Sequence, residues 1–160
     1  MENHIFKFNI DLNKNLLLEE LYKCLPNVIE YKDVRKDSFF SNWKIVKHSF
    51  PYANHIIDLL KLSKFDVRPR YYILDKNTTL KMHKDLGTLC SVNIILSEDP
   101  APINIEGTNY YYKQALINTQ ARHGVTEPSP LDRLLFKLSI MDCDFISAKN
   151  LISSNLPILE

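Results

Sequence analysis

Cysteine is scarce in this chain of 160 residues, which contains only Cys24, Cys90 and Cys143. The three are far apart in the sequence, and none belongs to a CxxC pair. A disulfide framework uses an even number of cysteines, and a structural zinc site usually draws on paired ones. The cysteine content therefore predicts a protein of a reducing compartment, without a disulfide framework and without a cysteine-bound zinc ion.

An excess of charge of one sign is also missing, because the formal net charge is +1. Partners such as nucleic acid or an acidic membrane surface usually select a strongly basic protein, so the charge disfavours both. The sequence has no apolar run long enough to span a bilayer, and its beginning, MENHIFKFNI, lacks the layout of a signal peptide. We therefore expect a cytoplasmic protein without a membrane segment.

The first 66 residues alternate between strand and helix patterns. Asn13 or Asn15 can cap a first helix, and Pro26 should stop it. A second helix carries a broad apolar stripe that needs a partner surface. The apolar periodicity predicts strands over 4–10 and 43–50 and helices over 16–25 and 52–64.

From residue 67 onward the sequence consists of short β-rich runs separated by turn residues such as Asp, Asn, Gly and Pro. This spacing favours a sandwich or jelly roll over a parallel α/β sheet. We expect one domain over 1–160, mainly β, with helical support in 1–66, a jelly-roll core in 67–141 and a C-terminal tail in 142–160. The runs are 67–74, 79–83, 89–96, 103–105, 109–117, 121–125 and 133–141.

The sequence His83-Lys84-Asp85 places an imidazole and a carboxylate two residues apart at the end of a predicted strand. Side chains at i and i+2 of a strand share a face, so His83 and Asp85 can point at one position. Of the other histidines, only His123 lies in the β-rich half. Two imidazoles and one carboxylate form the facial triad that holds non-haem Fe(II) and leaves coordination positions open. We therefore predict a metal site at these three residues.

Arg133 follows His123 by ten residues and opens the apolar run RLLFKLSIM. A guanidinium among apolar neighbours needs an anionic partner, and its planar fork suits a carboxylate. Arg133 is therefore the predicted anion-binding residue.

The order and spacing of HKD at 83–85, His123 and Arg133 resemble the signature of the Fe(II)/2-oxoglutarate-dependent dioxygenases. The resemblance covers about 67–141 and implies a double-stranded β-helix, the jelly roll of that superfamily. In size, the chain is similar to its prolyl-hydroxylase-like and aspartyl/asparaginyl-hydroxylase-like members.

The resemblance also implies an activity and its cofactors. Fe(II) would be held by His83, Asp85 and His123, and it would be chelated by the 1-carboxylate and 2-oxo group of 2-oxoglutarate. The distal carboxylate of that cosubstrate would pair with Arg133. With O2 as the second cosubstrate, the enzyme would hydroxylate a peptide or protein side chain or a free amino acid. The sequence does not indicate an oligomeric state.

Further candidates for the cosubstrate pocket are Asn93, Tyr71 and Tyr72. Asn93 sits at the centre of a predicted buried strand and must find partners, either 2-oxoglutarate or a neighbouring loop. One of Tyr71 and Tyr72 must face inward, where its hydroxyl could touch the cosubstrate or simply pack in the core. Lys137 has the parity of Arg133, and we expect it at a solvent edge.

Two other functions remain open on the sequence. The first is a catalytically inactive jelly-roll module that binds a sugar, nucleotide or protein and holds no Fe(II). The second is a cupin-type metalloenzyme that does not use 2-oxoglutarate; such an enzyme would have no need of Arg133. A nucleic-acid demethylase is disfavoured by the low net charge.

Overall fold

The computed structural model describes residues 4–25, 28–30, 43–46, 50–98 and 101–156. Within them, the strands form two antiparallel sheets, a large one in the order β1-β9-β6-β11-β4-β3-β2 and a small one in the order β5-β10-β7-β8. The two sheets face each other as the layers of a jelly roll, so the predicted fold class is confirmed. The strands of the large sheet are β1 (Ile5–Lys7), β2 (Val28–Glu30), β3 (Trp43–Val46), β4 (Val67–Leu74), β6 (Cys90–Ile95), β9 (Gln114–Ile117) and β11 (Arg133–Ile140). Those of the small sheet are β5 (Leu80–His83), β7 (Ile103–Ile105), β8 (Thr108–Tyr110) and β10 (His123–Val125).

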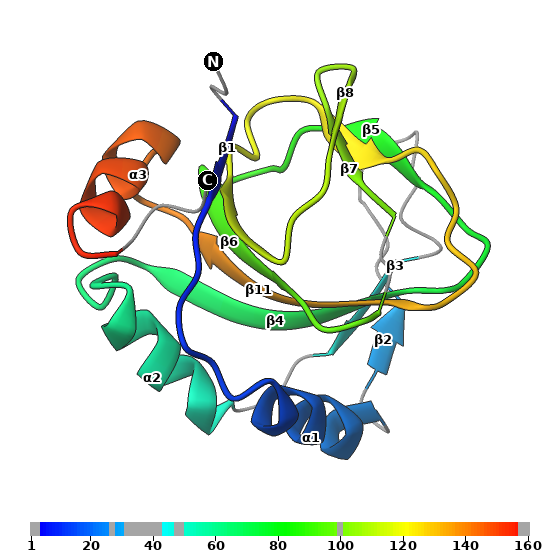
Figure 1. Ribbon diagram of the computed structural model, residues 1–160, viewed down its shortest axis with the longest axis horizontal. Helices are drawn as coiled ribbons and strands as arrows, with labels where there is room; N and C mark the ends of the chain where they lie inside the picture. Colours follow the sequence, from blue (N-terminus) through cyan, green and yellow to red (C-terminus); the bar gives the residue numbers. More distant parts are fainter. Residues whose placement is uncertain (1–3, 26–27, 31–42, 47–49, 99–100, 157–160) are drawn as a thin grey trace.

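Two helices, α1 (Lys14–Cys24) and α2 (Pro51–Leu59), lie on the side of the large sheet opposite the small sheet (Figure 1). The predicted cap of α1 is present, because the Asn13 side chain accepts a hydrogen bond from the Leu16 backbone N–H at 3.2 Å. The apolar stripe of α2 packs into the same core cluster as the large sheet, as expected. Helix α1 ends at Cys24 with Leu25 as its C-cap, one residue before the predicted end. Pro26 and residues 47–49 of the strand predicted over 43–50 lie outside the described residues.

Helix α2 ends five residues earlier than predicted. Lys61 adopts a left-handed conformation with φ +60°, and the Leu62 backbone N–H donates to the Ile57 carbonyl at 3.0 Å. Together with the bond from the Lys61 N–H to the Asp58 carbonyl at 3.1 Å, these form a Schellman C-cap without glycine. The apolar pattern continues through the cap, which is why periodicity alone extends the helix too far.

Two other predictions need correction. The run 109–117 is not one strand, because its ends, β8 and β9, belong to different sheets. Residues 142–160 are not only a tail, because they contain α3 (Phe145–Ser153). Asp144 caps α3 by accepting from the Ser147 N–H at 2.8 Å. In the part of the chain that the structure describes, no helix is long and apolar enough to cross a membrane.

The large sheet has a core on each of its faces. Residues that alternate along β4, β6 and β11 point either toward the helices or toward the small sheet. The helix-side cluster includes Tyr71, Val92 and Phe136, and the cluster between the sheets includes Ile95 and Leu135. The same alternation leaves polar side chains of β6 and β11 on the face between the sheets, where they line a cavity.

Candidate metal centre

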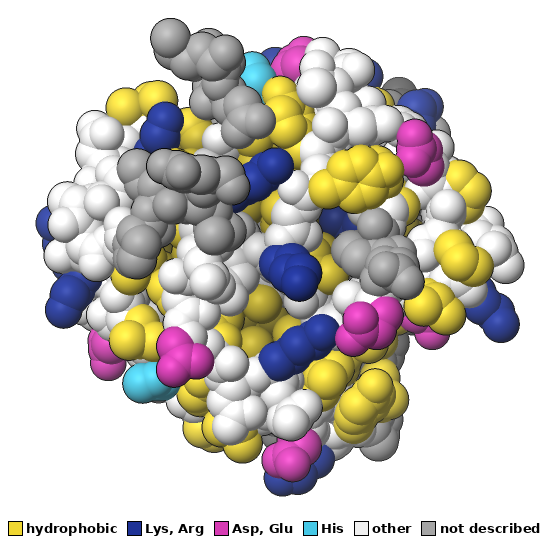
Figure 2. All heavy atoms as spheres, viewed as in Figure 1, with side chains coloured by type: hydrophobic (Ala, Val, Ile, Leu, Met, Phe, Trp, Pro, Cys, Tyr) yellow, Lys and Arg dark blue, Asp and Glu magenta, His cyan; other side chains and the backbone are white. Residues whose placement is uncertain are grey.

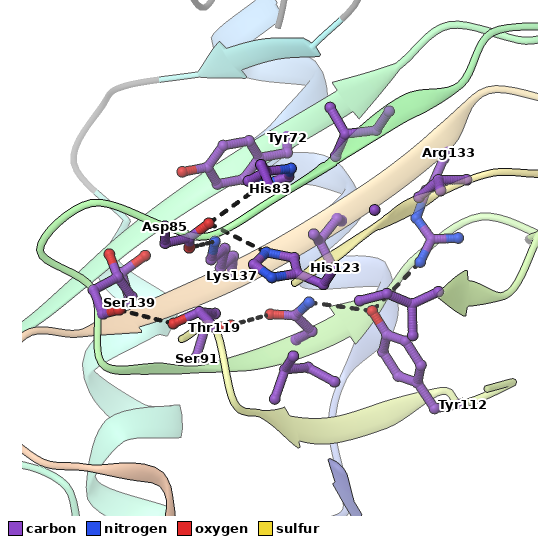
Figure 3. Close-up of a pocket in the computed structure, with 18 of the residues that line it drawn as sticks. Tyr72, His83, Asp85, Ser91, Tyr112, Thr119, His123, Arg133, Lys137 and Ser139 are labelled. Carbon is purple, nitrogen blue, oxygen red and sulfur yellow. Dashed lines mark hydrogen bonds and ion pairs between the residues drawn. The ribbon is translucent and has the colours of Figure 1, made fainter. Parts of the chain in front are cut away.

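The three predicted ligands meet at one end of the space between the two sheets (Figure 3). His83 ends β5, Asp85 follows it in the loop, and His123 begins β10. Strands β5 and β10 are antiparallel neighbours, and their register places His123 opposite His83. One ligand atom from each of the three side chains lies within 4.8 Å of the others. The structure therefore brings the predicted triad together.

Gly124 permits this register. Between the pairs His123–His83 and Val125–Leu80, two residues of β5 face Gly124 alone, which is a β-bulge. A Cβ atom on Gly124 would lie 2.5 Å from the Leu80 carbonyl oxygen. The close approach of the two backbones beside His123 therefore needs glycine.

We expect Gly124→Ala to lower the free energy of unfolding by about 1–3 kcal/mol, because β10 must move away from β5. The same movement should weaken Mn(II) binding, since it separates His123 from His83. The matched control is Gly107→Ala, which is strained by φ +88° but has open space around its Cβ. That control should lose stability without losing metal affinity. Chemical denaturation and Mn(II) titration test both, and a Gly124→Ala protein with wild-type values would contradict the expectation.

The two imidazoles are oriented by backbone carbonyls. His83 Nδ1 lies 2.7 Å from the Lys81 carbonyl oxygen, and His123 Nδ1 lies 2.8 Å from that of Ala121. A carbonyl only accepts, so each Nδ1 carries a proton, and a ring without a second proton directs its Nε2 lone pair elsewhere. Both Nε2 atoms point at Asp85 Oδ1, at 3.4 Å for His83 and 3.2 Å for His123. Three acceptor atoms thus converge, which suits a bound divalent cation.

The second oxygen of Asp85 has a different partner, the ammonium of Lys137, with Nζ 2.9 Å from Oδ2. Burial disfavours both charges, but their mutual attraction outweighs it. The pKa of Asp85 is therefore held well below its usual value and the pKa of Lys137 is raised above its own. The side chain of Lys137 is only 12% exposed, so its predicted place at a solvent edge is wrong. Lys137 shares the face of Arg133 on the strand, as predicted, but this face lines the cavity and not the protein surface.

Arg133 lies in the same cavity, of about 110 Å³, and is only 4% exposed. Its guanidinium donates to the Ala101 carbonyl and to the Tyr112 hydroxyl, the latter at 3.4 Å. Among the described residues, no carboxylate lies within ion-pair distance of it. The adjacent Asp132 instead accepts from the Lys76 backbone N–H at 2.8 Å. A buried guanidinium whose described partners are all neutral is suited to an incoming anion.

Asn93 and Tyr72 line the cavity, as the sequence allowed. Asn93 accepts from the Ser91 hydroxyl at 2.8 Å and donates to the Tyr112 hydroxyl at 3.2 Å, so a chain of polar groups links Asn93 to Arg133. Tyr112 belongs to the tyrosine run 110–112, which could line a substrate mouth, but a contact of Tyr112 with Arg133 is not predictable from the sequence.

Tyr71, a candidate for the cosubstrate pocket, lies elsewhere. It points to the helix side of β4, where its ring contacts those of Phe50 and Phe136 at centroid distances of 4.9 and 5.0 Å. Strand alternation allows only one of two successive tyrosines to face the cavity, and that one is Tyr72.

No protein-family model and no curated protein sequence matches the chain. Solved structures do. A viral collagen prolyl hydroxylase from Paramecium Bursaria Chlorella virus-1, solved with 2OG, superposes with a TM-score of 0.62 at 8% identity, over 89% of this chain and 97% of that one. A Pseudomonas putida prolyl-4-hydroxylase superposes with a TM-score of 0.60 at 11% identity, over 87% of this chain and 93% of that one. A Trichoplax adhaerens prolyl hydroxylase was solved with a peptide of the hypoxia inducible factor oxygen degradation domain. It superposes with a TM-score of 0.63 at 13% identity, over 93% of this chain and 86% of that one. The chain therefore shares the jelly-roll fold of these prolyl hydroxylases.

Proposed function

We propose that this protein is an Fe(II)- and 2-oxoglutarate-dependent dioxygenase of the prolyl-hydroxylase-like type. The observation that carries the proposal is a single cavity with two ends. His83, Asp85 and His123 converge at one end, and Arg133, buried and without a carboxylate partner among the described residues, lies at the other. A dicarboxylate that chelates a metal needs this pair of features, a cation site and a distal anion site.

The residues have separate tasks in this proposal. His83, Asp85 and His123 would hold Fe(II), which supplies O2 activation coupled to decarboxylation of 2-oxoglutarate. Arg133 would bind the distal carboxylate through its fork. Tyr112 and Asn93 hold the guanidinium end of the cavity in place through hydrogen bonds. The apolar walls, including Leu80, Ile103 and Leu135, restrict access of water to the reacting groups.

The two alternatives are less well supported. An inactive binding module would not need three acceptor atoms gathered around one point. A metalloenzyme without 2-oxoglutarate would not need a buried arginine such as Arg133, which has no carboxylate partner in the part of the chain that the structure describes. For the described residues on the face in Figure 2, Lys and Arg side chains are dispersed among acidic and hydrophobic ones and form no continuous stripe. A nucleic-acid substrate would favour such a stripe.

We propose a peptide or protein side chain as the substrate, with a free amino acid as the second candidate. The support is the likeness of fold to prolyl hydroxylases, one of which was solved with a peptide. Leu86, next to Asp85 at the cavity, is 65% exposed and offers an apolar contact to such a chain.

Anaerobic reconstitution tests the activity before a substrate is known. Fe(II) and 2-oxoglutarate together should give a weak visible charge-transfer band that neither gives alone, because the chelate requires both. The His123→Ala protein is the control and should give no band. A wild-type protein that binds Fe(II) tightly but shows neither the band nor any 2-oxoglutarate affinity would favour the cupin-type alternative. A protein that binds no metal would favour the binding module.

A further inference from the structure

The Asp85 carboxylate is divided between two kinds of partner. Its Oδ1 lies 3.2 and 3.4 Å from the Nε2 atoms of His123 and His83, where a metal ion would be held. Its Oδ2 lies 2.9 Å from Lys137 Nζ (Figure 3). A charge-assisted bond of this length to a buried ammonium is among the stronger polar contacts in a protein.

Lys137 is itself fixed by its surroundings. It lies in the middle of β11, whose neighbours on both sides, β4 and β6, hold the backbone in register with Arg70 and Asn93. Its ammonium also lies 5.4 Å from the centroid of the Tyr72 ring, within the range of a cation–π contact. The ammonium is thus held by a rigid strand in a buried place, and Asp85, which lies in a loop, is held by it.

We infer that Lys137 is a positioning residue that restricts Asp85 to one metal-ligating oxygen, Oδ1, by occupying the other. The inference rests on the metal site of the proposed function. A triad of two histidines and a carboxylate leaves positions on the metal open for cosubstrate and oxygen. A carboxylate that bound through both oxygens would close one of those positions. Lys137 keeps that position available.

The test uses Mn(II) as the probe and crystal structures of the loaded protein. In the wild-type protein, Asp85 should bind Mn(II) through Oδ1 alone. In Lys137→Met, the released Oδ2 should turn onto the metal, so that both oxygens ligate. Lys137→Arg should restore binding through one oxygen, because a guanidinium can also hold Oδ2. Lys137→Gln, whose amide is too short to reach Oδ2, is made in parallel with Lys137→Met, so that a variant that does not fold is replaced by the other.

Kinetics give a second measurement that a merely structural role would not produce. In Lys137→Met, turnover of 2-oxoglutarate at saturation should fall by at least about tenfold, whereas its KM should stay within about threefold of wild type, because the chelate still forms but one position is lost. Lys113→Met is the matched control, since Lys113 is exposed and lies outside the cavity. It should leave both constants unchanged.

Single-oxygen ligation in the folded Lys137→Met or Lys137→Gln protein would overturn the role of Lys137. So would a loss of saturating turnover that Lys137→Arg does not restore. A failure of the proposed function looks different, because the wild-type protein itself would then either hold no Mn(II) at Asp85 or bind Mn(II) without any affinity for 2-oxoglutarate.

Discussion

Replacement of His123 by alanine is expected to weaken Mn(II) or Fe(II) binding by more than about 100-fold, beyond the loss that removal of a hydrogen-bond partner of a ligand causes. The reason is geometric, because the remaining His83 and Asp85 cannot enclose an ion from one strand end alone. Turnover of 2-oxoglutarate should disappear with the metal. Titration calorimetry with Mn(II) measures the first effect, and succinate release measures the second.

The matched control is His55→Ala. His55 is exposed on α2, where its ring stacks on Tyr52 at a centroid distance of 5.3 Å, so its loss should leave metal binding unchanged. Thermal unfolding should show that His123→Ala still folds, since the ligands line a cavity and do not fill the helix-side core. Metal affinity within about threefold of wild type in folded His123→Ala would remove His123 from the site, because a true ligand costs far more.

Replacement of Arg133 by lysine should weaken the apparent affinity for 2-oxoglutarate by about 1–3 kcal/mol, while Mn(II) affinity stays the same. Lysine keeps the charge but loses the planar fork that binds a carboxylate through two hydrogen bonds. Arg133→Ala should nearly eliminate turnover that depends on 2-oxoglutarate. Titration of the Mn(II)-loaded protein with 2-oxoglutarate separates cosubstrate binding from metal binding.

Arg122→Lys is the control, because Arg122 is exposed and adjacent to His123 in the sequence. It should bind 2-oxoglutarate as the wild type does. If Arg133→Ala decarboxylates 2-oxoglutarate with wild-type affinity, the distal carboxylate is held elsewhere, and the proposed function loses its anion site.

Much of the site could be predicted because it depends on local rules. The spacing of two residues predicts a shared side for His83 and Asp85, and it holds although Asp85 lies just beyond the end of β5. Strand alternation puts Asn93 on the face of β6 that lines the cavity. An arginine at the start of an apolar strand needs a partner wherever the strand lies. The place of Arg133 in the cavity therefore follows from its neighbours in the sequence.

The rest depends on contacts between distant segments, which a single sequence does not record. Lys137 reaches Asp85 across 52 positions, and Tyr112 reaches Arg133 across 21. Parity assigns Lys137 to the face of Arg133, but only the loop after β5 decides that this part of the strand is enclosed. Alternation predicts that Tyr71 and Tyr72 point to opposite faces of the sheet. Which of the two faces the helices depends on packing with Phe50 and Phe136, which contact Tyr71.

The two-faced large sheet separates what keeps the protein folded from what determines its ligand. On β6, Val92 and Ile94 pack beneath the helices, while Ser91 and Asn93 line the cavity from the same strand. A substitution such as Ser91→Ala can therefore alter the shape and polarity of the cavity without touching the helix-side packing. Because of this division, single mutations on the cavity face can change which ligand the protein binds. The helix-facing residues of the same strands continue to stabilise the fold, so ligand specificity can evolve without loss of stability.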